Sequence, residues 1–434
     1  SSTRTSSSAA SDVYKRQIMT DYKKRVVITG MGVISCVGNT VNEFWDSLLN
    51  GKSGIDYLKQ LNTDNYSCKI GGEIKNFDPL NYMDKKESKR LAKNSQFAVA
   101  ASMEAISGAE LDLSNTDRLS MGALIGSGSG GTIPETEKET LQMYDKNRNT
   151  ISPIYVPKML PNMAASSVSR IFNLEGYSNA VSTACAAGTQ AIGEAYEVIL
   201  RGDADIMIAG GSEAPFCETT LGGFCNMHAL TSSNEDPKTA SKPFDKNRDG
   251  FVPSEGSAVL VLEKLENAIN RGKEPIAEIV GYSCTSDAYH LVQPQPEGKG
   301  ATNAMNKALS KANINFKEIN YINAHGTSTP ANDKAETLAI KNVFNDHAYN
   351  LKINSTKSII GHSSGAAGAM EAIACAKSIS EQRIHGTINY NTPDPECDLD
   401  YNPNKSTDYE INYALSNSFG FGGHNSCIIL SKFS

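Results

Sequence analysis

Long apolar runs are missing from this sequence of 434 residues. No stretch approaches the ~18 consecutive apolar residues that a membrane-spanning helix needs, which argues against insertion into a membrane. An excess of positive charge is missing too, because 48 acidic residues outnumber 41 Lys and Arg residues. Nucleic-acid binding normally needs such an excess. We therefore expect a protein that has neither a nucleic-acid partner nor a membrane partner.

Cysteine pairs are also absent. The nine cysteines are dispersed, with no CxxC spacing and no cluster of His and Cys. An odd, scattered set argues against a disulfide framework and against a zinc site, and it indicates a reducing compartment. The sequence thus predicts a cytoplasmic protein without a bound metal.

The first 18 residues lack the apolar periodicity of the rest. They read SSTRTSSSAASDVYKRQI, which is rich in Ser and Thr and contains basic residues. We interpret residues 1–18 as a disordered non-native or targeting extension outside the fold, and we expect the native chain to begin at Met19. A transit peptide is typically rich in Ser and Arg and poor in acid, and in that case the protein would act in an organelle.

Apolar runs that suit buried strands alternate with helical patterns along the remaining chain. RVVITGMGV, MGALIGSG and ADIMIAGGSEA are examples of such runs, and SQFAVAASMEAISGA is a helical pattern. This alternation predicts an α/β fold with largely buried sheets. A weak internal echo indicates duplication, because Cys185 and His362 each precede small residues and then an amphipathic helix. We place the two halves at residues 19–272 and 273–434, the first with a candidate nucleophile and the second with candidate histidines.

Two motifs suggest ligands that their context does not support. GSGSGG at residues 126–131 fits GxGxxG after a strand, but the polar segment that follows lacks the apolar helix and acidic strand end of a dinucleotide site. A tight glycine turn is the better interpretation. DKNRDGFVPSEG begins like a calcium loop at Asp245, but its closing glutamate, Glu255, falls one position early. A structured polar loop is more consistent with that spacing.

GHSSG at residues 361–365 supports a more serious alternative. It matches the GxSxG pattern of serine hydrolases, with Ser363 as the nucleophile. Acidic residues and a histidine follow in the order that such a triad requires, at Asp394, Asp398, Asp400 and His424. This hypothesis leaves Cys185 and His325 without a role.

Cys185 is the main candidate for covalent chemistry. It should lie at or just before the start of a helix that runs through Leu200 and stops at Gly202. The N-terminal end of a helix carries about +0.5 charge, which should lower the pKa of the thiol. A cysteine is also commonly just a small buried hydrophobe, so this position alone leaves both interpretations open.

Two histidines and a lysine complete the candidate set. His325 lies in NAHGTSTPANDKAE, and His362 follows Lys357 by five residues in STKSIIGHSSGAAGAMEAI. A lysine in such apolar surroundings needs a carboxylate partner, for which Glu371 on the next helix is the candidate. One thiolate and two imidazoles suit the condensation of two thioesters. The thiolate accepts an acyl group, and neutral imidazoles stabilise the enolate that forms when a malonyl thioester loses CO2.

In combination the motifs resemble the β-ketoacyl-[acyl-carrier-protein] synthases, most closely their type II branch. The resemblance covers residues 23 to about 432 and rests on KRVVITGMGVIS, STACAAG, GDADIMIAGGSEA, PFDKNRDGFVPSEG, NAHGTSTPANDKAE, KSIIGHSSGAAGAMEAI and NSFGFGGHN. It implies a thiolase-like fold of two similar halves in α-β-α-β-α layers. It also implies a homodimer that takes acyl and malonyl thioesters from acyl carrier protein.

The resemblance implies catalytic roles as well. Cys185 would accept the acyl group, and His325 and His362 would act in decarboxylation and condensation. Lys357 would tune His362 and would anchor the network with Glu371. No cofactor is implied, because phosphopantetheine arrives on the carrier protein, although some relatives hold a monovalent cation near the Asn-Ser-Phe loop.

Binding roles follow from the same resemblance. The backbone N–H groups of Cys185 and Phe421 would form the oxyanion hole. Phe421 would also gate the acyl pocket beside Phe419, and Thr327 and Thr329 would bind the phosphopantetheine arm.

Two positions depart from the pattern of the resembled family. Ser129 stands where bacterial relatives often have a large apolar residue facing the acyl pocket, so this chain should differ in chain-length preference. Ser233 stands where relatives often have an arginine that helps to dock the carrier protein. A basic cluster that matches the docking helix is present, at Lys85, Lys86, Lys89 and Arg90. Charge pattern alone would equally suit a solvated helix face.

Two further alternatives remain at this point. A polyketide-type ketosynthase would use the same chemistry on a different acyl chain or carrier. A non-catalytic binding or scaffold protein would have no use for Cys185, His325, Lys357 and His362 together, which makes it the weaker alternative. The sequence does not determine the length of the acyl chain.

Overall fold

The computed structural model describes residues 25–145 and 150–433. The predicted extension at residues 1–18 lies outside the described residues. Within the described ranges, no helix combines the length and the apolar character needed to cross a membrane.

Ten strands form the central sheet, and they fall into two sets of five. The first set runs in the order β5 (Ser178–Val181), β4 (Met121–Gly126), β6 (Ile206–Glu213), β7 (Gly256–Lys264) and β1 (Val26–Ile34). The second set runs in the order β10 (Lys352–Asn354), β9 (Tyr321–Asn323), β13 (Tyr413–Gly420), β14 (His424–Ser431) and β8 (Ala277–Ser286). Along each set, the first two pairings are parallel and the last two are antiparallel. The two halves therefore share one topology, as a duplication would produce.

The two sets of strands meet at one edge. β1 pairs with β8 antiparallel over three residues, from Val26 opposite Ile279 to Ile28 opposite Ala277. The strands are buried along most of their length, for example at all nine residues of β1. This matches the continuous apolar runs of the sequence, because strands covered on both faces need no polar alternation.

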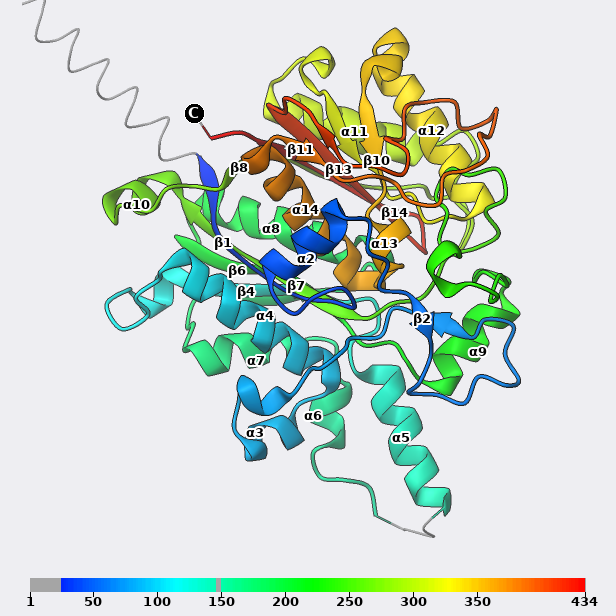
Figure 1. The fold of residues 1–434 in the computed structure, drawn as a ribbon. Helices are drawn as coiled ribbons and strands as arrows, with labels where there is room; N and C mark the ends of the chain where they lie inside the picture. Colours follow the sequence, from blue (N-terminus) through cyan, green and yellow to red (C-terminus); the bar gives the residue numbers. More distant parts are fainter. Residues whose placement is uncertain (1–24, 146–149, 434) are drawn as a thin grey trace, which may run out of the picture.

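Helices form three layers around the two strand sets (Figure 1). α8 (Ala187–Arg201) and α14 (Ala367–Glu381) lie between the sets and contact each other. α4 (Lys93–Ala109) and α7 (Met163–Phe172) cover the outer face of the first set, and α11 (Lys299–Ala312) and α12 (Pro330–Phe344) cover the second. The predicted thiolase-like α-β-α-β-α layering is confirmed.

The remaining elements connect and cap these layers. The helices are α2 (Val41–Leu49), α3 (Lys85–Arg90), α5 (Thr132–Asp145), α6 (Tyr155–Met159), α9 (Glu218–Asn226), α10 (Leu265–Asn270) and α13 (Lys357–Ile360). The short strands are β2 (Asp56–Tyr57), β3 (Ile70–Gly71), β11 (Arg383–Ile384) and β12 (Thr407–Asp408). α3, α5 and α6 project together from one end of the molecule (Figure 1).

The internal echo of the sequence has a structural counterpart with a different register. α8 and α14 are each preceded by a 3-10 turn, Ala184–Ala186 and Ser364–Ala366 respectively. Cys185 is the middle residue of the first turn, and Gly365 is the middle residue of the second. Cys185 and His362 both precede small residues and a helix, as expected, but they do not occupy equivalent positions relative to the two turns. His362 lies earlier, in the loop that leads into the second turn.

Candidate active site

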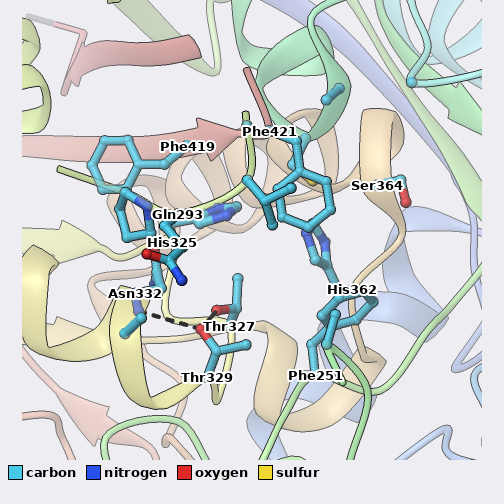
Figure 2. A pocket seen from close by; sticks show the side chains of 18 of the residues that line it. Phe251, Gln293, His325, Thr327, Thr329, Asn332, His362, Ser364, Phe419 and Phe421 are labelled. Atoms are coloured by element: carbon cyan, nitrogen blue, oxygen red, sulfur yellow. Dashed lines mark hydrogen bonds between the residues drawn. The ribbon is translucent and has the colours of Figure 1, made fainter. Parts of the chain in front are cut away.

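A cavity of about 460 Å³ lies between the two halves. Most of the residues singled out from the sequence line it, namely Ser129, Cys185, His325, Thr327, Thr329, His362, Phe419 and Phe421. Figure 2 shows His325, His362 and Phe421 around this space, with Thr327 and Thr329 on one wall. Lys357 and Glu371 are buried and do not line the cavity.

Cys185 is presented to the cavity by the turn before α8. Ala184 has a φ of 50°, a left-handed conformation that is unfavourable for a residue with a Cβ atom. Cys185 follows directly and is half-buried, and α8 then runs to Arg201 with Gly202 at its end. The sequence placed the cysteine and the end of the helix correctly. The left-handed Ala184 residue thus lies directly before the cysteine that lines the cavity.

The Cys185 thiol is less acidic than its position suggests. Removal from water raises its pKa to about 12, and the charge of Glu213 adds to this. The Lys357 ammonium and backbone N–H groups of Phe421 and Cys185 oppose the rise without overcoming it. The expected lowering of the Cys185 pKa is therefore not found, because loss of hydration outweighs the Lys357 charge and the nearby N–H groups. Cys185 rests as a neutral thiol.

This resting state predicts a steep pH dependence of alkylation. Between pH 7 and 10 the pH lies below the pKa of Cys185, so only a small fraction of the thiol is ionised. Because that fraction grows about tenfold per pH unit, the rate of iodoacetamide labelling should rise by the same factor. Labelling of the isolated protein, with peptide mass spectrometry to resolve Cys185 from the exposed Cys284, measures this. A rate that levels off near pH 7 would contradict a raised pKa.

His325 follows β9 and is 2% exposed. The buried carboxylate of Glu336 accepts the backbone N–H groups of His325 at 2.9 Å and Gly326 at 2.8 Å, which fixes this loop. Lys357 Nζ lies 3.3 Å from His325 Nδ1. Because an ammonium can only donate, Nδ1 must accept, and the proton of the neutral ring then resides on Nε2.

His362 follows α13 and is 3% exposed. Its backbone N–H donates to Val252 O at 2.7 Å, and its carbonyl accepts from Ser254 N at 3.0 Å. These two bonds fix the backbone beside the ring. The His362 ring lies edge-on to that of His325, with 5.3 Å between the centroids and 85° between the planes.

Both imidazoles are held neutral. Burial lowers the pKa of His325 well below its usual range, and the charge of Lys357 lowers it further. The same two causes, in the same order, lower the pKa of His362. Neutral imidazoles can donate N–H to a developing negative charge without adding a buried positive charge of their own.

Lys357 carries the positive charge of the site. It is 1% exposed and forms a buried ion pair with Glu371, the partner expected from the sequence. Its charge lowers the pKa of His362, which agrees with the expected tuning, but the imidazole that Nζ contacts is that of His325. The topology explains this. β9 and β10 are parallel neighbours, so the residues that follow them, His325 and Lys357, emerge at the same sheet edge.

Hydroxyl and aromatic groups line the walls of the cavity. The hydroxyls of Thr327 and Thr329 lie 2.9 Å apart, and Thr329 also caps α12 (Figure 2). Phe419 packs against the ring of His325 at 5.6 Å between centroids. Phe421 packs against Phe224 at 6.4 Å. The cavity thus combines a polar wall with an aromatic wall.

Two buried carboxylates of the site were missed in the sequence. Glu336 fixes the His325 loop and also accepts from Asn417 Nδ2 at 3.2 Å. Glu213, at the end of β6, accepts from Gly128 and Ser129 in the GSGSGG loop. Their partners are largely backbone N–H groups, which leave no signal in side-chain spacing. The glycine-rich loop therefore directs its N–H groups at an internal carboxylate rather than at a nucleotide phosphate.

The serine hydrolase hypothesis loses its nucleophile. Ser363 is fully buried, and its hydroxyl contacts Met370 Sδ at 3.6 Å. It does not line the cavity, although Ser364 beside it does (Figure 2). The aspartates proposed for a triad are engaged in ion pairs, Asp394 with Arg248, Asp398 with Lys341 and Asp400 with Lys352.

The calcium-like motif serves internal contacts. Asp245 accepts the backbone N–H groups of Asn391 and Thr392, both at 2.6 Å. Asp249 accepts from Thr231 Oγ1 at 2.6 Å and from Ser233 Oγ at 3.2 Å. Ser233, at the position where an arginine was expected from relatives, thus supports the loop.

The basic cluster lies on an exposed face of α3. Asp84 caps this helix through Lys86 N and Glu87 N, both at 2.8 Å. Glu87 forms an ion pair with Arg170 of α7, which ties the short helix to the body of the protein. The four basic side chains, Lys85, Lys86, Lys89 and Arg90, point to solvent.

Family comparisons match both halves of the chain. A family model described as "Beta-ketoacyl synthase, N-terminal domain" matches residues 23–268. A second, "Beta-ketoacyl synthase, C-terminal domain", matches residues 276–391. The 3-oxoacyl-[acyl-carrier-protein] synthase 2 of Staphylococcus aureus strain N315 is 47% identical over 410 residues, covering 94% of this chain and 99% of that relative. The protein of the same name from Synechocystis is 45% identical, covering 95% of this chain and 99% of that relative.

Solved structures agree with these matches. A chain from a type II PKS acyl-carrier protein in complex with its ketosynthase bound to the hexaketide superposes with a TM-score of 0.88 at 36% identity. The match covers 94% of this chain and all of that one. A β-ketoacyl synthase from Burkholderia phymatum superposes with a TM-score of 0.87 at 33% identity, covering 95% of this chain and all of that one.

Proposed function

Because this chain belongs to the β-ketoacyl synthase family, we propose that it is a 3-oxoacyl-[acyl-carrier-protein] synthase that elongates fatty acids by decarboxylative condensation. The observation that carries the proposal is the convergence of Cys185, His325 and His362 on one cavity at the interface of the two halves. A thiol beside two neutral imidazoles suits thioester condensation, because the thiol can accept the acyl group and the imidazoles can donate to the enolate.

The first step is acyl transfer to Cys185. The sulfur attacks the carbonyl of an acyl-carrier-protein thioester, and the proton of the thiol leaves with the pantetheine sulfur. The oxyanion forms opposite the backbone N–H groups of Cys185 and Phe421, which both interact with the Cys185 sulfur. A neutral thiol with a pKa of about 12 is a weak nucleophile. The thiol must therefore lose its proton as the sulfur approaches the thioester carbonyl.

The second step is decarboxylation of malonyl-acyl carrier protein. The bond between the carboxylate and the methylene carbon breaks, CO2 leaves, and the electron pair becomes an enolate on the thioester. His325 donates from Nε2 to the enolate oxygen, since Lys357 occupies Nδ1. The ring of His362, which lies edge-on to that of His325, donates the second N–H to the enolate oxygen.

The third step forms the carbon–carbon bond. The enolate carbon attacks the acyl carbonyl on Cys185, and the cysteine sulfur leaves as a thiolate. The product is 3-oxoacyl-acyl carrier protein, and the thiolate takes one proton from solvent. The raised pKa of Cys185 returns it to the neutral thiol at pH 7.

The steps use side chains and two thioester substrates, with no organic cofactor. A monovalent cation would fit beside the Asn-Ser-Phe loop, because Asn417 Oδ1 is buried without a hydrogen-bond partner near the Glu336 carboxylate. Hard cations of this kind prefer such oxygen ligands. Its contribution would be to fix the loops that carry His325 and Phe419.

We propose acyl carrier protein as the partner, because the names of the relatives specify that carrier. The exposed basic face of α3 is the candidate docking surface, since a basic patch speeds encounter with an acidic protein. A homodimer and a cytoplasmic location remain predictions from the sequence. A polyketide-type ketosynthase would share the chemistry, but the relatives that cover the chain at 45–47% identity are named for 3-oxoacyl-acyl carrier protein synthesis.

Charge reversal on α3 should weaken use of the carrier-bound substrate. We expect Lys86→Glu combined with Lys89→Glu to raise the KM for malonyl-acyl carrier protein by about tenfold, because the attraction becomes repulsion. Turnover of malonyl-pantetheine, which has no protein to dock, should stay unchanged. Lys405→Glu, at an exposed lysine of the second half, is the matched control. Equal losses with both substrates would exclude α3 as a docking surface.

The identity of the acyl chain is open to direct measurement. Purified protein is incubated with acyl-acyl carrier proteins of several lengths and malonyl-acyl carrier protein, and the products are weighed by mass spectrometry. The proposal predicts products two carbons longer that carry a 3-oxo group, with loss of CO2. Release of free acid alone would instead indicate a hydrolase.

A further inference from the structure

Glu213 is a buried carboxylate of the site that the proposed steps do not use. It is the last residue of β6 and is fully buried, yet it lines the cavity beside Cys185. Three other buried carboxylates pair with cations, Glu255 with Lys93, Glu263 with Arg271 and Glu371 with Lys357, whereas Glu336 resembles Glu213 in relying on hydrogen bonds. No ion pair within residues 25–145 and 150–433 includes Glu213. An unpaired buried carboxylate is costly unless hydrogen bonds hold it in place.

Five donors converge on this carboxylate. Oε2 accepts the backbone N–H groups of Gly128 at 2.5 Å and Gly365 at 3.2 Å. Oε1 accepts from Ser127 Oγ at 3.2 Å, Ser129 Oγ at 3.2 Å and Ser129 N at 3.4 Å. Burial raises the pKa of Glu213, and these hydrogen bonds oppose the rise because three of the five donors are backbone N–H groups, which favour the ionised acceptor form.

These donors come from both halves of the molecule. Ser127, Gly128 and Ser129 belong to the loop after β4, whereas Gly365 belongs to the turn after His362. The two backbones touch, since a methyl group added at Gly365 would lie 2.3 Å from Gly128 N. The N–H groups of Gly128 and Gly365 are buried where the two backbones meet, so each needs an acceptor, and Glu213 Oε2 accepts both.

The two segments also carry the working surfaces of the cavity. Ser129 lines the cavity near Cys185, and His362 is three residues before Gly365. We propose that Glu213 is a positioning residue for the condensation, which holds the Gly128–Ser129 wall against the His362 turn and sets the charge beside Cys185. This inference rests on the proposed function.

The negative charge of Glu213 distinguishes a positioning role in the active site from simple support of the fold. The charged groups with the largest effects on the pKa of Cys185 are Lys357, which favours the thiolate, and Glu213, which disfavours it. The two imidazoles nearby are neutral. Loss of the Glu213 charge should therefore make Cys185 more reactive, whereas loss of a purely structural group would not.

Glu213→Gln removes the charge and keeps most of the geometry. The amide oxygen can still accept from Gly128 and Gly365, and the NH2 group can donate to the hydroxyls of Ser127 and Ser129, so only the long bond from Ser129 N is lost. Glu213→Ala removes both the charge and the acceptors, and it leaves backbone N–H groups unpaired. Glu104→Gln is the matched control, because Glu104 accepts two backbone N–H groups, from Val33 and Val41, away from the cavity.

The test measures iodoacetamide labelling of Cys185 between pH 7 and 9, together with condensation. We expect Glu213→Gln to label about threefold to tenfold faster than wild type at each pH and to keep the fold by circular dichroism. Glu104→Gln should label at the wild-type rate. Glu213→Ala should lose condensation about 100-fold or more through misplaced loops.

Wild-type labelling rates in Glu213→Gln would overturn the proposal, as would wild-type condensation in Glu213→Ala. Because Glu213→Gln is compared with wild type by labelling, the proposal stays testable even where Glu213→Ala does not fold. Labelling does not depend on the overall reaction. If the wild-type protein showed no condensation activity, the proposed function would be refuted. The comparison of labelling rates between Glu213→Gln and wild type would still show whether the Glu213 charge affects the Cys185 thiol.

Discussion

Replacing Cys185 by alanine should abolish condensation. The thiol lies at the helix start beside the N–H groups of Phe421 and of Cys185 itself, where it can hold an acyl chain during malonyl decarboxylation. Loss of a covalent nucleophile typically costs about 10⁴-fold or more in turnover. Product formation from acyl- and malonyl-acyl carrier protein, followed by mass spectrometry, measures the loss.

Ser363→Ala is the matched control for this variant. Ser363 is the rival nucleophile, and its buried hydroxyl contacts only Met370 Sδ among the hydrogen-bond partners found within the described residues. We expect Ser363→Ala to condense at close to the wild-type rate. The reverse pattern, with activity lost in Ser363→Ala and kept in Cys185→Ala, would restore the hydrolase hypothesis and refute the present mechanism.

Removing either imidazole should separate the two half-reactions. We expect His325→Ala and His362→Ala to slow decarboxylation about 10²- to 10⁴-fold, because each removes one N–H donor from the enolate oxygen. Acyl transfer to Cys185 should fall far less, since its oxyanion is stabilised by backbone N–H groups. Release of labelled CO2 from malonyl-acyl carrier protein measures the first process, and intact mass of the acylated protein measures the second.

His347→Ala serves as the control, because its ring bonds to the backbone carbonyl of Ile319 outside the cavity. The two catalytic variants should also differ from each other. His325→Ala leaves the Lys357 ammonium without its imidazole contact, whereas His362→Ala leaves that contact in place. Normal CO2 release in both variants would exclude the imidazoles as the decarboxylation pair.

The α/β class with buried sheets was predictable from the residues because its signals are local, whereas the α-β-α-β-α layering was implied by the family resemblance. Buried strands read as continuous apolar runs, and the breaker Gly202 marks the end of α8, where its φ of 88° suits glycine. The partner of Lys357 was also predictable, since a buried ammonium needs a carboxylate and Glu371 is the nearest candidate on the next helix. Local rules of this kind apply without knowledge of the neighbouring strands.

Three features depended on tertiary structure and were missed or misjudged. Lys357 reaches His325 because β9 and β10 are parallel neighbours, a pairing that the sequence does not state. Glu213 and Glu336 act through backbone N–H groups, which every residue except proline carries. The pKa of Cys185 rises because burial outweighs the Lys357 charge and the nearby N–H groups, a balance that depends on how much water the folded walls remove.

The central claim is that Cys185 carries the acyl chain that the malonyl unit then captures. The most direct measurement is the intact mass of the protein after incubation with an acyl-acyl carrier protein, before and after addition of malonyl-acyl carrier protein. The account predicts a mass increase of one acyl group, mapped by peptide analysis to Cys185, which disappears as 3-oxoacyl-acyl carrier protein forms. An acyl group on another residue, or one on Cys185 that persists while product accumulates, would contradict it.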